Sequence, residues 1–454
     1  MSPPLDTSRV LSTLNVDGTR HWLTPRLARG RFLSRRRIVG YALIALFVAL
    51  PFVRIGGRPA FLIDLVVREL DIAGAVFRPS DSVVLMLLGL AIVFAVFFAT
   101  ALFGRVWCGW GCPQTVYLEL VFRPIERWLG GKRGRTPTRA QRVAKWAIYA
   151  ALAFALANVF LAYFVGTDRL SLWILESPAD HLGGFSLVVG VSALMLFDFG
   201  YFREQLCIVA CPYGRLQSVL IDRQSLIVGY DVRRGEPRGK PRAKLPVVGD
   251  CVDCGACVDV CPTGIDIRDG LQMECTGCAQ CIDACDAVMG KLKRPRGLIR
   301  YTSQDELAGL PRRVLRGRTL AYPALLLLAV GLLAVGVGGR TTADITIERA
   351  SGPSFVELTD SRVSSQVRLH VENDTDEPHA YTLSLAGLAA ELSLRGATTW
   401  TIGARKALEV SVFVDAPRSS FVHGERAVDL RIDDDASFER VVRATLLGPE
   451  GAVR

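Results

Sequence analysis

The sequence predicts a multi-domain membrane protein that combines an α-helical bundle, a small cysteine-rich domain and a C-terminal β-sandwich. Three observations predict this fold class. Five apolar runs are spread along the 454 residues, eight cysteines fall in two tandem frames between positions 251 and 285, and the segment after position 344 alternates polar and apolar residues. Half of the residues are hydrophobic and the mean hydropathy is +0.30, which argues against a purely soluble protein.

The apolar runs are each long enough, or nearly so, to cross about 30 Å of hydrocarbon as a helix. They cover Ile38 to Val53, Ser82 to Phe103, Val143 to Val165, Phe185 to Phe199 and Leu320 to Val337. We therefore expect five transmembrane helices. The first and fourth runs are short, and a buried or re-entrant helix is the alternative for each of them.

The distribution of Lys and Arg predicts the orientation of these helices. The N-terminal arm holds eight arginines, and three of them (Arg35, Arg36 and Arg37) directly precede the first run. The segment between the second and third runs is also basic, with Arg105, Arg123, Arg127, Lys132, Arg133, Arg135, Arg139 and Arg142, whereas only Arg169 follows the third run. By the positive-inside rule the N-terminus is cytoplasmic, and an odd number of spans places the C-terminus outside.

The net charge of +10 is unevenly distributed. Residues 341–454 hold 12 Lys and Arg against 18 Asp and Glu, a net charge of −6, so the rest of the chain carries +16. This positive charge lies beside the apolar runs, where it would face anionic lipid rather than form a compact basic domain. The expected partner of the basic segments is the lipid bilayer, and we expect no nucleic acid.

Two tandem C-x2-C-x2-C-x3-C frames have the ligand spacing of a pair of [4Fe–4S] clusters. In such a tandem the fourth cysteine of each frame crosses to the other cluster. One cluster would be held by Cys251, Cys254, Cys257 and Cys285, and the other by Cys275, Cys278, Cys281 and Cys261. The frames predict a bacterial-type 2[4Fe–4S] ferredoxin domain that moves electrons. Two structural zinc sites are the alternative, and Asp286 stands where a proline usually follows the last cysteine.

A second cysteine pattern, C-x3-C-P, occurs twice, each time just after an apolar run. It comprises Cys108 and Cys112 before Pro113, then Cys207 and Cys211 before Pro212. The repetition suggests a duplicated two-helix unit that brings both pairs near one axis. All twelve cysteines lie between positions 108 and 285, in regions predicted at the cytoplasmic face, which favours metal binding over disulfides.

These four cysteines are candidate catalytic residues and candidate copper ligands. Cysteines at i and i+4 on one helix face have β-carbons about 5–6 Å apart, close enough for two thiolates to hold a soft cation such as Cu(I). Each proline should open the helix at that point. A third iron–sulfur cluster, a four-thiolate zinc site and simple burial are the alternatives.

Short alternating runs separated by turn clusters predict that the last segment is an immunoglobulin-like β-sandwich of about seven strands. Examples are residues 366–371, 381–385 and 407–414. His370, His379 and His423 could offer copper ligands, but lone histidines in a β-domain are more often surface or satisfied core residues. We expect this domain to dock a partner.

The expected domains, in chain order, are a cytoplasmic basic arm (1–37), a transmembrane hairpin (38–104), a cytoplasmic loop with the first C-x3-C-P (105–142), a second hairpin (143–203), a cytoplasmic segment with the second C-x3-C-P (204–245), the ferredoxin domain (246–290), a basic linker (291–318), a fifth span (319–338) and the external immunoglobulin-like domain (341–454).

The sequence around the C-x3-C-P pairs (residues 107–115 and 203–217), together with the tandem frames and a last span before a β-domain, resembles the FixG/CcoG family of cytochrome oxidase accessory proteins. The cysteine motifs are shared with NapH and NosR relatives, so the C-terminal domain is what points to FixG/CcoG. The resemblance implies a multi-pass protein of the bacterial inner membrane with a periplasmic C-terminal domain.

The resemblance also implies assembly of cbb3-type oxidase, with reduction of Cu(II) to Cu(I) for its copper centre. The cofactors would be two [4Fe–4S] clusters and a copper ion at Cys108, Cys112, Cys207 and Cys211. The implied partners are cbb3-type oxidase subunits or other copper-handling assembly factors, an electron donor that the residues do not identify, and a second copy of the chain in a homodimer. The alternatives to a cupric reductase are a NapH-like quinol-to-ferredoxin conduit and a non-redox assembly scaffold.

Overall fold

The computed structural model of the chain describes residues 9–15, 17, 19–130, 137–239, 249–339, 342–349, 355–358, 361–375, 377–386, 391–434, 436 and 438–449. Three of the basic residues used to predict orientation lie outside these ranges: Lys132, Arg133 and Arg135. The chain divides into two compact units, Met1–Ala334 and Val335–Arg454. The first unit contains all twelve cysteines, and the second contains the β-sandwich.

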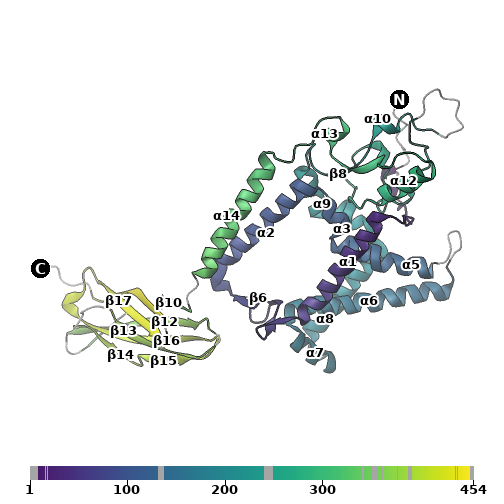
Figure 1. The fold of residues 1–454 in the computed structure, drawn as a ribbon. Helices are drawn as coiled ribbons and strands as arrows, with labels where there is room; N and C mark the ends of the chain where they lie inside the picture. Colours follow the sequence, from purple (N-terminus) through teal and green to yellow (C-terminus); the bar gives the residue numbers. More distant parts are fainter. Residues whose placement is uncertain are drawn as a thin grey trace. The chain divides into compact units, whose positions relative to one another are not determined.

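Four helices of the described chain are long and apolar enough to cross a membrane, so the chain has the character of a membrane protein. They are α2 (Ser82–Phe103), α6 (Arg139–Val165), α8 (Leu182–Phe197) with its π-helical continuation η4 (Asp198–Phe202), and α14 (Gly317–Gly338). Each forms where an apolar run predicted it. In the most apolar 18-residue stretch of α6, 39% is buried, against 6% in that of α14. Helix α6 therefore lies inside the bundle, where it packs along α8 (Figure 1).

Helix α1 (Arg31–Ala49) forms at the first predicted span but is not one of these four. Its second turn contains three consecutive arginines, so the apolar stretch begins only at Ile38 and continues through the 3₁₀ turn η1 (Leu50–Phe52). The fifth span therefore stays a prediction. The connection from α1 to α2 is not a plain loop but a set of short antiparallel strands: β3 (Arg54–Ile55), β4 (Arg58–Pro59), β5 (Phe61–Asp64), β6 (Glu69–Ile72) and β7 (Ala75–Phe77), followed by the 3₁₀ turn η2 (Pro79–Asp81).

Short helical segments follow α2 and the α8–η4 helix, at the two C-x3-C-P motifs. They are α3 (Val106–Trp110), α4 (Pro113–Tyr117), the π-helical turn η3 (Leu118–Phe122) and α5 (Arg123–Leu129) after α2, and the π-helical turn η5 (Leu206–Ala210) and α9 (Pro212–Leu220) after η4. A further helix, α7 (Thr167–Leu175), connects α6 to α8, and a strand pair, β1 (Arg9–Leu11) with β2 (Leu14–Asn15), lies in the N-terminal arm.

The ferredoxin domain is larger than the predicted range 246–290. Strand β8 (Ile227–Tyr230) pairs antiparallel with β9 (Ile299–Thr302), so residues predicted as a cytoplasmic segment and a basic linker close this domain. Between them lie α10 (Val232–Gly235), α11 (Ala256–Asp259), η6 (Ile267–Asp269) and α12 (Gln280–Lys291), and α13 (Gln304–Leu307) follows β9. Val228, Tyr230 and Ile299 of this pair, with Leu298 just before β9, are buried in one apolar cluster with Cys251 and Cys257.

The second unit is an immunoglobulin-like sandwich of two antiparallel sheets. One sheet has the order β10 (Ala343–Arg349), β12 (Arg362–Asn373), β16 (Ala407–Pro417), β14 (Ser393–Arg395), and β11 (Val356–Glu357) also pairs with β12. The other sheet has the order β15 (Thr399–Ile402), β13 (His379–Leu385), β17 (Glu425–Asp434), β18 (Glu439–Leu447). The 3₁₀ turn η7 (Arg418–Ser420) follows β16. Seven of these nine described strands have four or more residues. The alternating side chains of β12 bury Val367, Leu369 and Val371 against the other sheet.

Candidate electron-transfer site

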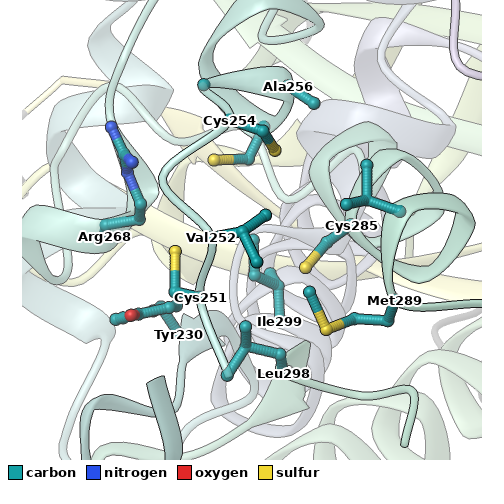
Figure 2. A pocket seen from close by; sticks show the side chains of 13 residues that line it. Tyr230, Cys251, Val252, Cys254, Ala256, Arg268, Cys285, Met289, Leu298 and Ile299 are labelled. Atoms are coloured by element: carbon teal, nitrogen blue, oxygen red, sulfur yellow. The ribbon is translucent and has the colours of Figure 1, made fainter. Parts of the chain in front are cut away.

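The first cluster pocket contains the four cysteines that the spacing assigns to one cluster. Cys251, Cys254, Cys257 and Cys285 all line it, although Cys285 comes from helix α12 and the others come from the loop before α11 and from α11 itself. Figure 2 shows Cys251, Cys254 and Cys285 around this pocket, with Met289 and Ile299 on its apolar wall.

The second pocket is lined by Cys261, Cys275, Cys278 and Cys281, and it shares Cys257 with the first. The crossing of one cysteine from each frame is therefore present in the fold. Ligation by these eight residues stays a prediction, but the thiols are arranged as two adjacent cubanes would require.

The backbone around both pockets repeats one conformation. Asp253 and Gly255 flank Cys254 with φ of 52° and 67°, and Gly277 and Ala279 flank Cys278 with φ of 69° and 61°. Left-handed residues between right-handed ones turn successive backbone N–H groups toward the inside of the loop, where they stabilise an anionic group. An anionic iron–sulfur group fits both loops on this observation.

Burial raises the pKa of several ferredoxin cysteines and keeps them protonated in the absence of metal. It raises the pKa of Cys257, Cys275 and Cys285 to about 12 each, and it raises the pKa of Cys281 well above the usual value. Because iron binds the thiolate, cluster assembly must release these protons. Cys254 is exposed, so the first pocket reaches the protein surface.

The two C-x3-C-P motifs share a turn that differs from the predicted continuous helix. Cys108 lies in α3, but Cys112 is the extended N-cap residue of α4 with ψ of 125°; Cys211 is likewise the extended N-cap residue of α9, with ψ of 111°. The prolines that follow cause this, because a residue before proline is disfavoured in helical conformation. The prediction that the prolines open the helix is confirmed, and the prediction of one shared helix face is wrong.

The two C-x3-C-P motifs also share the backbone conformation of the residue four positions before their first cysteine. Gly104 has φ 55° and ψ −127°, and Arg203 has φ 52° and ψ −121°. Glycine adopts this region readily, whereas an arginine is strained in it. Arg203 is buried and forms a 3.1 Å ion pair with Glu126, which holds the strained turn in place.

The structure brings the two cysteine pairs near one another, and we call Cys108, Cys112, Cys207 and Cys211 together the four-thiol site. Cys207 interacts electrostatically with each of the other three. The Thr115 hydroxyl hydrogen-bonds both Cys112 and Cys207, so it links the two pairs.

Burial is also the main influence on the pKa values of this site. It raises the pKa of Cys207 to about 12 and that of Cys108 to about 11, and neighbouring thiols add to both effects. The Arg105 guanidinium opposes the shift at Cys108. The thiols of Cys108 and Cys207 are therefore protonated at neutral pH until a cation displaces the protons.

Within the described ranges, no three His, Cys, Asp or Glu side chains are placed to hold a single metal ion. Ligands of a cubane surround a group of several atoms and stand far apart, so this finding leaves the two ferredoxin pockets unaffected. It favours neither a four-thiolate zinc site nor a copper ion held by three or more of the four thiols, and it gives no support to a copper site at His370, His379 and His423.

The four-thiol site lies directly against the second cluster pocket. A β-carbon on Gly109, between Cys108 and Cys112, would lie 2.7 Å from the Cα and 2.8 Å from the backbone N of Cys278. Trp110 Nε1 donates to the Tyr301 hydroxyl at 3.0 Å, and this hydroxyl donates to the Gly277 carbonyl at 2.6 Å. Backbone contact and a hydrogen-bonded chain thus connect the two sites.

A buried ion network joins the same regions from the other side. Glu204, which is 2% exposed, pairs with Arg20 at 3.0 Å and with Arg123 at 3.1 Å. Arg123 also donates to the Pro262 carbonyl at 3.3 Å, next to Cys261. The N-terminal arm, the second C-x3-C turn and the ferredoxin domain are therefore held together by one carboxylate.

The sequence analysis missed several residues of this site. Gln217 is fully buried, and its Oε1 accepts from the Cys108 sulfur at 3.1 Å. Asp283 accepts from the backbone N–H groups of Phe32 and Leu33, at 3.2 and 2.8 Å, and so caps helix α1. The sequence did contain a signal for these residues. Charged and amide residues such as Glu204 and Gln217 stand among apolar residues near Cys207 and Cys211, which is typical of buried polar groups at a functional site.

Three family models match the chain. A 4Fe–4S dicluster domain matches residues 202–304, a 4Fe–4S binding domain matches residues 85–136, and the IG-like fold at the C-terminal of FixG matches residues 333–449. Iron–sulfur clusters are thus supported for this chain, in agreement with the thiol-lined pockets.

Full-length relatives point the same way. The chain is 33% identical to the protein RdxB of Cereibacter sphaeroides, over 98% of this chain and 100% of the relative. It is 33% identical to the nitrogen fixation protein FixG of Rhizobium meliloti, over 93% of this chain and 92% of the relative. The ferredoxin-type protein NapH of Haemophilus influenzae is 26% identical over 51% of this chain and 87% of its own length. This chain therefore belongs to the FixG family of polyferredoxin-like iron–sulfur electron-transfer proteins.

Proposed function

We propose that the protein is a membrane-bound cupric reductase in which the four-thiol site binds Cu(II) and releases Cu(I) for the copper centre of a cbb3-type oxidase. The observation that carries the proposal is the backbone contact between Gly109 and Cys278, because it joins the segment between Cys108 and Cys112 directly to a residue that lines the second cluster pocket. Cu(II) becomes Cu(I) by gaining one electron, and thiolates prefer the reduced ion.

The bound clusters supply electrons one at a time. The residues of the chain bind and orient the copper ion. Each thiol loses its proton as copper binds, and the positive charge of Arg105 favours this loss at Cys108. Thr115 favours the thiolates of Cys112 and Cys207 by hydrogen bonding.

The proposed topology has five spans, a cytoplasmic N-terminus and a periplasmic sandwich in a bacterial inner membrane. The arginines at the start of α1 and the basic residues between α2 and α6 support it. In this arrangement the four-thiol site is at the cytoplasmic side, and oxidase subunits or copper-handling factors are the partners of the sandwich. A homodimer remains part of the proposal.

A third iron–sulfur cluster in the four-thiol site is the second candidate, because the 4Fe–4S binding domain model covers both Cys108 and Cys112. Iron analysis separates the candidates. An iron content above that of two cubanes per chain, with the excess lost when Cys108 and Cys207 are replaced by serine, would show that the four-thiol site holds iron instead of copper. Cluster reduction that never passes to copper would favour the NapH-like conduit, and full function without clusters would favour the scaffold.

Gly109→Ala tests the contact with the cluster pocket. The added β-carbon must push two backbone segments apart, because the atoms within 3.0 Å belong to the backbone of Cys278 and Thr276. We expect Cu(II) reduction to fall by about 10- to 100-fold, since displacements of about 1 Å have such effects. Gly190→Ala in α8 is the control, because nothing lies within 4 Å of its added β-carbon. Equal activity in both variants would contradict the proposed route.

Gln217→Leu tests how the thiolate is stabilised. Gln217 Oε1 accepts from the Cys108 thiol, while its Nε2 has no partner among the described residues; rotation of the amide would let Nε2 donate to the thiolate. Leucine offers neither bond, so we expect Cu(I) affinity to fall about 10- to 100-fold with unchanged cluster content. Competition with a chromogenic chelator measures this affinity. Gln304→Leu, at the start of α13, is the control for the same chemical change.

A further inference from the structure

The turn between strands β5 and β6 has an unusual composition for a hairpin. Asp64 pairs with Glu69 at the end of the two strands, so residues 65–68 form the turn. Its first three residues, which we call the apolar tip, are exposed by 63%, 68% and 53%: Leu65, Val66 and Val67. Hairpin turns are mostly built from Gly, Asn, Asp, Pro and Ser. Three consecutive exposed apolar residues in a turn indicate that another apolar phase covers them.

The backbone N–H groups of the apolar tip all have partners inside the protein. The N–H of Leu65 donates to the carbonyl of Phe164 in α6 at 3.4 Å. The next two N–H groups of the tip donate to the buried Asp64 carboxylate at 2.9 and 3.1 Å. Arg169 of α7 balances the charge of this carboxylate, with N–O distances of 2.9 and 3.2 Å. Contact with hydrocarbon requires this kind of internal satisfaction, because lipid chains offer no hydrogen bonds.

The apolar tip is level with the end of a helix that is long enough to cross a membrane. About 20 helical residues cover about 30 Å of hydrocarbon, and in α6 such a stretch runs from Trp146 to its last residue, Val165. The residues of α6 before this stretch include three cations: Arg139, Arg142 and Lys145. Phe164, whose carbonyl bonds the tip, therefore lies at one boundary of the hydrocarbon. The tip is at the depth where acyl chains meet headgroups.

The fourth residue of the turn is a cation without a partner among the described residues. Arg68 is exposed and takes part in no hydrogen bond or ion pair there. The carboxylate next to it, Glu69, is already paired with Arg78 at 3.2 Å. A guanidinium forms paired hydrogen bonds with phosphate oxygens, and an arginine beside apolar residues reaches from the edge of the hydrocarbon to the headgroups. Arg68 therefore offers a site for an anionic headgroup next to the apolar tip.

We propose that the apolar tip inserts among the acyl chains of the bilayer and that Arg68 binds the phosphate of an anionic phospholipid. Apolar residues beside one free cation match a lipid, which has an apolar tail and an anionic head. A protein strand is the poorer occupant, because the N–H groups of the tip are already bonded and cannot extend a sheet. The inference requires that α6 crosses a membrane. It depends neither on which side the turn faces nor on the proposed reduction of copper.

The experiment places the photo-crosslinker p-benzoylphenylalanine at Val66 of the full-length, cluster-loaded protein. The protein is irradiated in nanodiscs of phosphatidylethanolamine with a minor share of phosphatidylglycerol, and mass spectrometry identifies the adduct. We expect one phospholipid on the turn, with phosphatidylglycerol enriched about 5-fold over its share of the nanodisc, since one arginine near anionic lipid has an effect of that size. The crosslinker at Val232 is the matched control, because this valine is 55% exposed on α10 of the ferredoxin domain and should give no lipid adduct.

Arg68→Gln, made in the protein that carries the crosslinker at Val66, tests the headgroup site. We expect the lipid adduct to remain and the enrichment of phosphatidylglycerol to disappear, whereas Arg296→Gln, at an exposed arginine of the ferredoxin domain, should preserve the enrichment. Iron content and cluster absorbance report whether each variant is folded. Three outcomes overturn the inference: no lipid adduct above that at Val232, enrichment that is absent or persists in Arg68→Gln, or a protein adduct in place of lipid when intact cells are irradiated, which would assign the tip to a protein partner.

Discussion

Replacing Cys108 and Cys207 together by serine is expected to lower Cu(II) reduction by at least about 100-fold, because serine removes one soft ligand from each cysteine pair of the four-thiol site. The eight ferredoxin cysteines remain, so the iron content and the absorbance of the clusters should not change. The measurement starts from dithionite-reduced, desalted protein, and follows cluster re-oxidation together with Cu(I) trapped by a chromogenic chelator.

The single variants refine this prediction. Cys207 interacts with all three other thiols and is more strongly shifted in pKa than Cys108, so its loss should have the larger effect. Full copper reduction in the double variant would show that copper is reduced elsewhere, with the exposed Cys254 edge of the first cluster pocket as the next place to examine.

The second large effect is expected for Glu204→Gln. The carboxylate is buried among Arg20, Arg123 and Arg203, and the variant leaves these cations with one negative charge fewer. Breaking a buried ion network in this way costs about 3–5 kcal/mol. We expect a clearly lower thermal midpoint in detergent, and reduced copper activity in the protein that stays folded, because the network links the second C-x3-C turn to Pro262 beside Cys261.

An exposed carboxylate in the same unit provides the control. Glu176 pairs with His181 at the surface with 50% of its side chain exposed, and exposed pairs contribute at most about 1 kcal/mol. Glu176→Gln should therefore leave the thermal midpoint nearly unchanged. Equal stability of both variants would mean that the Glu204 network is not what holds the C-x3-C turn against the ferredoxin domain.

Local patterns were sufficient to predict much of the fold. The apolar run Ser82–Phe103 became α2 with the same bounds, because an uninterrupted apolar sequence must form a helix in lipid to satisfy its backbone. The alternation in the last segment became the strands of the sandwich. Cysteine spacing predicted the two ligand sets, since ligands of one cluster are mostly neighbours in the chain.

Predictions from local sequence patterns were wrong where a second structural constraint acted on the same residues. The spacing of Cys108 and Cys112 suggested one helix face, but Pro113 imposes an extended residue before it and the helix is interrupted. The ferredoxin range ended too early because β8 and β9 are paired across the whole domain.

By itself, the sequence determined where the long apolar helices lie, where the strands of the sandwich lie and which cysteines belong to each frame, because these depend on residues a few positions apart. Only the tertiary structure decided that Gln217 bonds Cys108, 109 positions away, and that Gly109 rests on the backbone of Cys278. It also placed Gln280 against α1 and the η3 turn. Such contacts follow from how whole elements pack, and packing depends on the shape and burial of many side chains at once, which no local spacing records.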